Sequence, residues 1–111
     1  METIPRDDFR KGGLRRSGIW VVAFLADWCG FCRRFAPQFE TLDGLGPYRI
    51  AVADVTDEEN PLWELFGIDV VPAVFVFREG QAIYHEQSDL GMGLRDGVLD
   101  RLRAAASSSA K

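Results

Sequence analysis

The chain has 111 residues, which predicts one domain with a single hydrophobic core. Hydrophobic residues make up 47% and charged residues 27%, so the composition excludes the disordered and fibrous classes. The net charge of −4 excludes a general nucleic-acid binder, although residues 1–34 carry a surplus of three positive charges and leave −7 to residues 35–111.

The start of the chain is unlike a secretory signal, because acids occur early and no apolar run follows them. No stretch approaches the roughly 18 uncharged residues of a membrane span. We therefore expect a cytoplasmic protein without a membrane partner. The next segment, 7–16, predicts a short helix, which its two adjacent glycines weaken.

A strand followed by an amphipathic helix is the strongest pattern in the chain. The uninterrupted apolar run Ile19–Leu25 predicts a strand covered on both faces, as in the centre of a parallel sheet. Beyond it, Phe35, Phe39 and Leu42 repeat at helical spacing. This predicts a helix that starts at residue 31 or 32 and ends near Gly44.

The second half of the chain predicts shorter elements. They are, in chain order, a strand at 48–55, a short helix at 62–66, a hairpin of strands at 74–77 and 82–85, and a last helix whose apolar side runs from Leu94 to Leu102. Together these elements predict an α/β fold with one domain over residues 1–106. Residues 107–111 are predicted to be a frayed tail.

Cys29 and Cys32 carry the predicted chemistry. A disulfide that closes so short a loop constrains the unfolded chain little, so the pair is predicted to be catalytic or metal-binding rather than a stabilising disulfide. Cys29 lies at the predicted helix start, where the helix dipole and the nearby Arg33 and Arg34 favour a thiolate. Cys32 is one turn onward and can resolve a mixed disulfide.

The sequence Trp28-Cys29-Gly30-Phe31-Cys32, at a strand-to-helix junction, resembles the active-site motif of the thioredoxin family. Three further segments resemble that family in its order and spacing. They are a helix continuation with a proline at 33–37, the approach to a cis-proline at 67–72, and a hairpin turn at 77–80. The resemblance covers about residues 17–103.

The resemblance implies a thioredoxin fold, with a central mixed sheet of four to five strands flanked by helices. It implies a thiol–disulfide oxidoreductase that reduces protein disulfides, with Cys29 as nucleophile and Cys32 as resolving thiol. It also implies electrons from a reductase or another thiol donor, no bound cofactor, and a monomer. Pro72 is expected in a cis bond facing the cysteines, with the Val71 backbone free to bind an extended substrate.

Four more residues are expected to contact substrate. Trp28 and Phe31 are predicted to form an exposed apolar rim beside Gly30. The resemblance further implies a glycine lining the substrate groove. Gly91 is the expected residue, and Gly93 competes with it for this position.

Three positions depart from the family pattern. Ala23 stands where thioredoxins carry a buried aspartate that moves the proton of the second cysteine, and Val52 stands where a lysine often accompanies it. We therefore expect slower reduction, with Cys32 deprotonated through water or a substrate group. Phe31 replaces a proline, and its N–H is expected to point at the Cys29 sulfur and make the redox potential more oxidising.

Other functions stay open at this point. The fold could serve as a binding module, or the cysteines could work in an oxidase or isomerase. Two buried structural thiols are a further alternative. A zinc site needs four ligands, which this chain could supply only by bridging two copies, so no metal is predicted. His85 is expected to be a half-exposed strand residue, and Asp27 a solvated charge, rather than catalytic bases.

Overall fold

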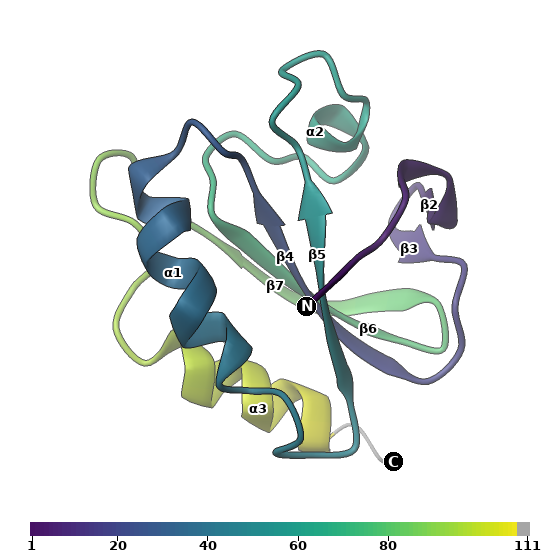
Figure 1. Ribbon diagram of the computed structural model, residues 1–111. Coiled ribbons are helices and arrows are strands. Elements are labelled where there is room, and N and C mark those ends of the chain that lie inside the picture. Colours follow the sequence, from purple (N-terminus) through teal and green to yellow (C-terminus); the bar gives the residue numbers. More distant parts are fainter. Residues whose placement is uncertain (109–111) are drawn as a thin grey trace.

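A mixed sheet of seven strands forms the centre of the computed structural model, which describes residues 1–108 (Figure 1). The strand order is β1-β5-β4-β6-β7-β3-β2. The strands are β1 Glu2–Thr3, β2 Phe9–Arg10, β3 Gly13–Leu14, β4 Ile19–Leu25, β5 Arg49–Asp54, β6 Ala73–Arg78 and β7 Gln81–Gln87. The helices are α1 Gly30–Glu40, α2 Leu62–Leu65 and α3 Val98–Ser108, with a 3₁₀ turn at Arg6–Asp8.

The predicted thioredoxin fold is confirmed. The four longer strands β5, β4, β6 and β7 are the expected central sheet, in which β4 pairs parallel with β5 and antiparallel with β6. Three two-residue strands extend this sheet at both edges. No helix in the described part of the chain is long and apolar enough to cross a membrane.

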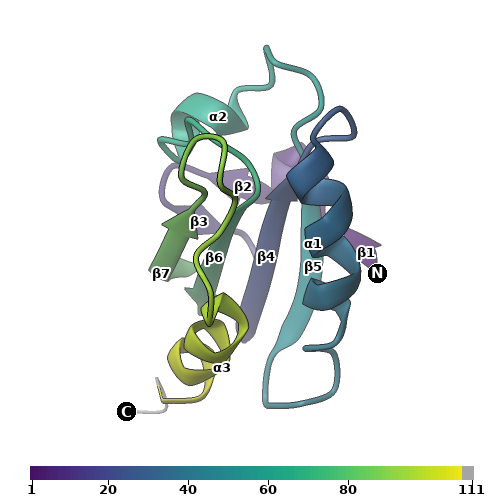
Figure 2. The same ribbon diagram turned by 90° about the vertical axis from the view of Figure 1, so that its left-hand side faces the viewer.

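Helices cover both faces of the sheet, which explains the continuous apolar run in β4. Helices α1 and α3 lie on one face, and α2 lies on the other with the β2–β3 hairpin (Figure 2). Val21 and Ala23 pack in the cluster under α1 and α3, whereas Val22 and Phe24 pack in the opposite cluster. Because successive side chains of a strand alternate in direction, both sets must be apolar.

The helix predicted at 7–16 is wrong. The segment forms a 3₁₀ turn and then the β2–β3 hairpin, whose β3 pairs with β7 through Gly13 and Gln81. A side chain at Gly13 would come within 2.4 Å of the Gly80 carbonyl oxygen, so this glycine permits the close approach. Gly12, at φ +69°, makes the turn. Pairing with a strand so distant in sequence outweighs the weak helical pattern.

The helix ends also differ from the prediction. α1 begins at Gly30, before the predicted start, and ends at Glu40, with Leu42 packed in the turn beyond it. α3 begins at Val98, after the predicted Leu94, and runs to Ser108. It therefore passes the predicted domain end at residue 106, and the rest of the predicted tail, 109–111, lies outside the described residues.

Candidate active site

Cys29 caps the N-terminus of α1. Its Sγ accepts a hydrogen bond from the Cys32 N–H, with a sulfur–nitrogen distance of 3.1 Å. Both cysteines are free thiols in this structure. The helix N-terminus and this donor together stabilise negative charge on the sulfur. The expected Phe31 donor is wrong, because the N–H that reaches Cys29 belongs to Cys32.

The Val71–Pro72 segment faces Cys29. The bond between these two residues is cis, as the resemblance implied, and the Cys29 thiol donates to the Val71 carbonyl oxygen at 3.6 Å. The Pro72 carbonyl oxygen accepts hydrogen bonds from the backbone N–H of Ser88 at 3.1 Å and from its hydroxyl at 2.7 Å. Ser88, a buried residue that the sequence interpretation missed, thus ties this segment to the end of β7.

Cys32 is buried more deeply than Cys29. Cys32 is only 2% exposed. This burial is the larger cause that raises the pKa of the Cys32 thiol to about 12, and the hydrogen bond with Cys29 is the next. Arg33 and the backbone of Ala26 act in the opposite direction. The thiol is therefore protonated at neutral pH and needs a proton acceptor before it attacks a disulfide.

A small hollow gives Cys32 a path to the surface. It has a volume of about 240 Å³, and Val52, Asp27 and Asp54 are among its lining residues. Both carboxylate residues are exposed. Ala23, the position of the family's buried acid, is fully buried and pairs with Val52 in the β4–β5 ladder. A proton leaving Cys32 can therefore reach solvent through the hollow.

Trp28 is the exposed aromatic residue beside the cysteines. It is 50% exposed, and it stacks on Trp63 with ring centroids 6.3 Å apart and an interplanar angle of 7°. Its indole N–H donates to the Thr56 carbonyl oxygen at 2.8 Å. Thr56, in turn, accepts from the Asp27 N–H and donates to the Asp54 carboxylate through its hydroxyl. The Asp-x-Thr spacing is a turn signal that could have marked Thr56 in the sequence.

Phe31 lies between Arg34 and Gly93. The Arg34 guanidinium sits over the ring, 4.7 Å from its centroid, and a side-chain carbon at Gly93 would come within 2.9 Å of the ring. A carbon at Gly91 would meet nothing within 4 Å. The structure thus places Gly93, and not the expected Gly91, against the predicted rim. Gly30 is open, since a carbon there would meet only the Arg33 guanidinium, at 3.8 Å.

The remaining polar candidates lie apart from this arrangement. His85 is exposed on β7 and stacks on Phe75, with ring centroids 5.1 Å apart. Within residues 1–108, no three His, Cys, Asp or Glu side chains gather in a way that could hold a metal ion.

Two thiols at a helix N-terminus, opposite a cis-proline at the edge of a mixed sheet, define a thiol–disulfide oxidoreductase of the α/β class. The family model described as Thioredoxin matches residues 2–96. The chain belongs to the thioredoxin family.

Known proteins agree with this assignment. The chain is 32% identical to a thioredoxin of Rhodospirillum rubrum over 82 residues, which are 73% of this chain and 79% of that protein. It is 33% identical to protein disulfide-isomerase A3 of Gallus gallus over 105 residues, which are 89% of this chain but only 19% of that longer protein. A mutant thioredoxin from Halobacterium salinarum has a TM-score of 0.66 at 29% identity, with 82% of this chain and 76% of that chain covered.

Proposed function

We propose that this protein reduces disulfides of other proteins, with Cys29 as the nucleophile and Cys32 as the resolving thiol. The observation that carries the proposal is the hydrogen bond from the Cys32 N–H to Cys29 Sγ at 3.1 Å. It favours a thiolate on Cys29 and keeps the second thiol one turn away. The Val71 carbonyl oxygen, 3.6 Å from the Cys29 sulfur, supports the proposal, because a backbone group at this place can hydrogen-bond an extended substrate.

The reaction consists of two exchanges. The Cys29 thiolate attacks one substrate sulfur, a mixed disulfide forms, and the other substrate sulfur leaves as a thiolate that takes up a proton. Cys32 then loses its proton and attacks Cys29 Sγ, which releases the second substrate sulfur. Two electrons pass from the dithiol to the substrate and leave a disulfide between Cys29 and Cys32. A reductase or another thiol donor reduces this disulfide, and no bound cofactor takes part.

Reduction of insulin with dithiothreitol as electron donor tests the proposal. We expect turnover in the wild type, loss of turnover in Cys29→Ser, and a trapped mixed disulfide in Cys32→Ser, because the second exchange is then blocked. Unchanged turnover in Cys29→Ser would contradict the proposal. Substrate binding without turnover in any variant would favour a binding module.

A second candidate is an isomerase, because the chain is similar over most of its length to a protein disulfide-isomerase. The redox potential of the cysteine pair distinguishes the two functions. A value near −270 mV in glutathione buffers favours the reductase, and a value near −180 mV favours the isomerase.

The proposal also includes the cellular location and the oligomeric state of the protein. We place it in the cytoplasm, where cellular reductants keep such thiols reduced, and we expect it to act as a monomer. Cell fractionation and the mass measured by light scattering test these two points.

A further inference from the structure

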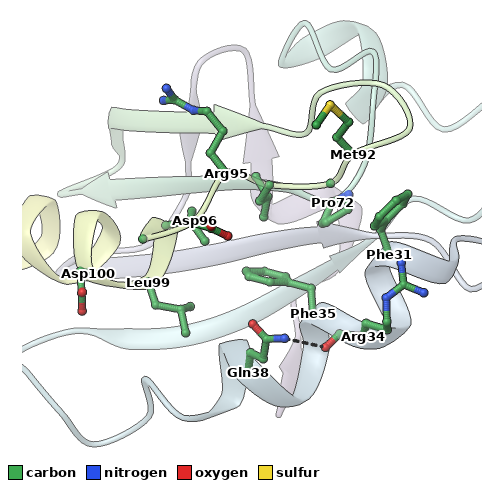
Figure 3. Close-up of a pocket in the computed structure, with 14 residues that line it drawn as sticks. Phe31, Arg34, Phe35, Gln38, Pro72, Met92, Arg95, Asp96, Leu99 and Asp100 are labelled. Atoms are coloured by element: carbon green, nitrogen blue, oxygen red, sulfur yellow. Dashed lines mark hydrogen bonds between the residues drawn. The ribbon is translucent and has the colours of Figure 1, made fainter.

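A groove of about 460 Å³ begins beside the cysteines and runs between α1 and the segment that joins β7 to α3 (Figure 3). Phe31 and Pro72 lie at one end, and Leu99 and Asp100 of α3 lie at the other. Along α1 the groove extends from Phe31 to Gln38, which corresponds to about 10 Å of helix, or about three residues of extended peptide. The groove can therefore hold the chain next to a substrate cysteine.

The walls of the groove are partly apolar. Phe35 is buried in it, and Leu94 and Leu99 are half-buried. Met92, 76% exposed, lies beside Pro72 at the end nearest the cysteines. A flexible, exposed methionine adapts to different neighbours, so the shape of the groove discriminates little between substrate side chains. Charge is the property left to discriminate between them.

Arg34 supplies positive charge at the cysteine end. Its guanidinium is held over the Phe31 ring at 4.7 Å and forms no ion pair with a carboxylate of residues 1–108. The other arginine of the groove, Arg95, turns its guanidinium away from α1 in Figure 3. Arg34 is therefore placed, with its N–H donors unused by protein carboxylates, where a substrate acid would lie.

Negative charge gathers at the opposite end. Asp100 lines the groove there and Asp96 lies between it and Pro72 (Figure 3), and neither forms an ion pair within the described residues. The nearby Arg101 does not neutralise them, because its guanidinium binds the Glu86 carboxylate and the carbonyl oxygens of Arg95 and Asp96. The groove is thus positive beside the cysteines and negative toward α3.

We propose that this groove selects disulfide substrates with an acidic residue next to the reacting cysteine and a basic residue about three positions farther along. The proposal rests on the reductase function and names the substrate class of that site. Arg34 binds the acid, and Asp96 and Asp100 attract the base. The chemistry is unchanged, since two electrons pass from the dithiol to the peptide disulfide and two peptide thiols leave.

Two peptides of identical composition test the proposal. Both are symmetrical disulfides with a self-quenched fluorophore that brightens on reduction. One carries aspartate beside the cysteine and lysine three positions away, and the other has these two residues exchanged. Each of the two peptides is made in two versions, one with the charged residues before the cysteine and one with them after it. We expect kcat/KM to be about two- to fivefold higher for the first order in one of the two placements, and this preference to disappear in 0.5 M salt.

The variant Arg34→Glu should abolish the preference, because both ends of the groove are then negative, whereas Arg103→Glu, on the exposed side of α3, should leave it intact. Since both peptides are compared on the same variant, any general effect on thiol reactivity cancels. Equal rates for the two orders in both placements, or a preference that survives in Arg34→Glu, overturns the proposal while the reductase function stands. Failure to reduce any peptide overturns both.

Discussion

Ala23 of β4 and Val52 of β5 are direct neighbours in the parallel ladder, and Ala23 is completely buried. The family resemblance implies a buried acid and a lysine at these two positions, and both are apolar here, with Val52 lining the hollow beside Cys32. Replacing both charges together leaves neither one unpaired in the core. We therefore expect the buried Cys32 thiol to lose its proton to water in the hollow beside it or to a substrate group.

We expect Ala23→Asp to speed the second exchange, release of the mixed disulfide by Cys32, by about 100-fold, because a carboxylate then accepts its proton. Stopped-flow single-turnover reduction measures this rate. The matched control is Ala23→Asn, which adds a similar polar group without a base.

Burial of the new carboxylate should destabilise the fold by several kcal/mol. The double variant Ala23→Asp/Val52→Lys supplies a lysine to pair with the carboxylate and is used if the single variant unfolds. Equal rates in the Asp and Asn variants, or a double variant no faster than the wild type, would show that proton transfer does not limit the exchange.

Gly93→Ala should cost more stability than Gly91→Ala. Both glycines have positive φ, +75° and +77°, so each substitution adds about 1 kcal/mol of backbone strain. Only the alanine at position 93 meets the Phe31 ring, at 2.9 Å, which we expect to add about 1 kcal/mol and to lower kcat/KM for protein disulfides. Urea unfolding and insulin reduction measure the two effects. Identical losses in both variants would mean that the ring shifts freely.

Alkylation should separate the two thiols. Because burial raises the pKa of Cys32 to about 12, this residue stays a thiol at pH 8, and iodoacetamide should label it at least about tenfold more slowly than Cys29. Quenched samples analysed by peptide mass spectrometry give both rates from one reaction. An unstructured cysteine peptide is the reference, and we expect Cys29 to react faster than this peptide at pH 7. Labelling of Cys29 at or below the reference rate would remove the basis for its role as nucleophile.

Glu86 should make stability depend on acid pH. Its carboxylate accepts hydrogen bonds from Arg101 and from the Tyr84 hydroxyl, and the Arg101 bonds are the main cause that lowers the pKa of Glu86 below its usual 4.5. Since the unfolded state binds the proton more readily, this contribution is present above about pH 4.5 and is lost as the pH falls through the lowered value.

Glu86→Gln should therefore lower the unfolding free energy at pH 7, and the difference from the wild type should shrink in acid. Urea unfolding at pH 7 and at pH 3 measures it, with Glu64→Gln, an exposed residue of α2, as the control. A constant difference at both pH values would mean that the ion pair contributes nothing.

Local pattern was enough to predict the central elements. The apolar run of β4 and the helical spacing of Phe35 and Phe39 depend on residues close together in the chain, and so does the position of Cys29 at a helix start. The cis bond before Pro72 was predicted from the family resemblance, since the residues around a proline do not by themselves reveal the isomer.

Tertiary structure decided the rest. Pairing of the β2–β3 hairpin with β7, the hold of Ser88 on the Pro72 carbonyl, and the contact of Phe31 with Gly93 each join segments far apart in sequence. Such contacts depend on the summed packing of the whole domain, which no local periodicity records. The burial that keeps Cys32 protonated belongs to this second group, so the sequence placed both sulfurs, and only the folded chain set the environment of the second one.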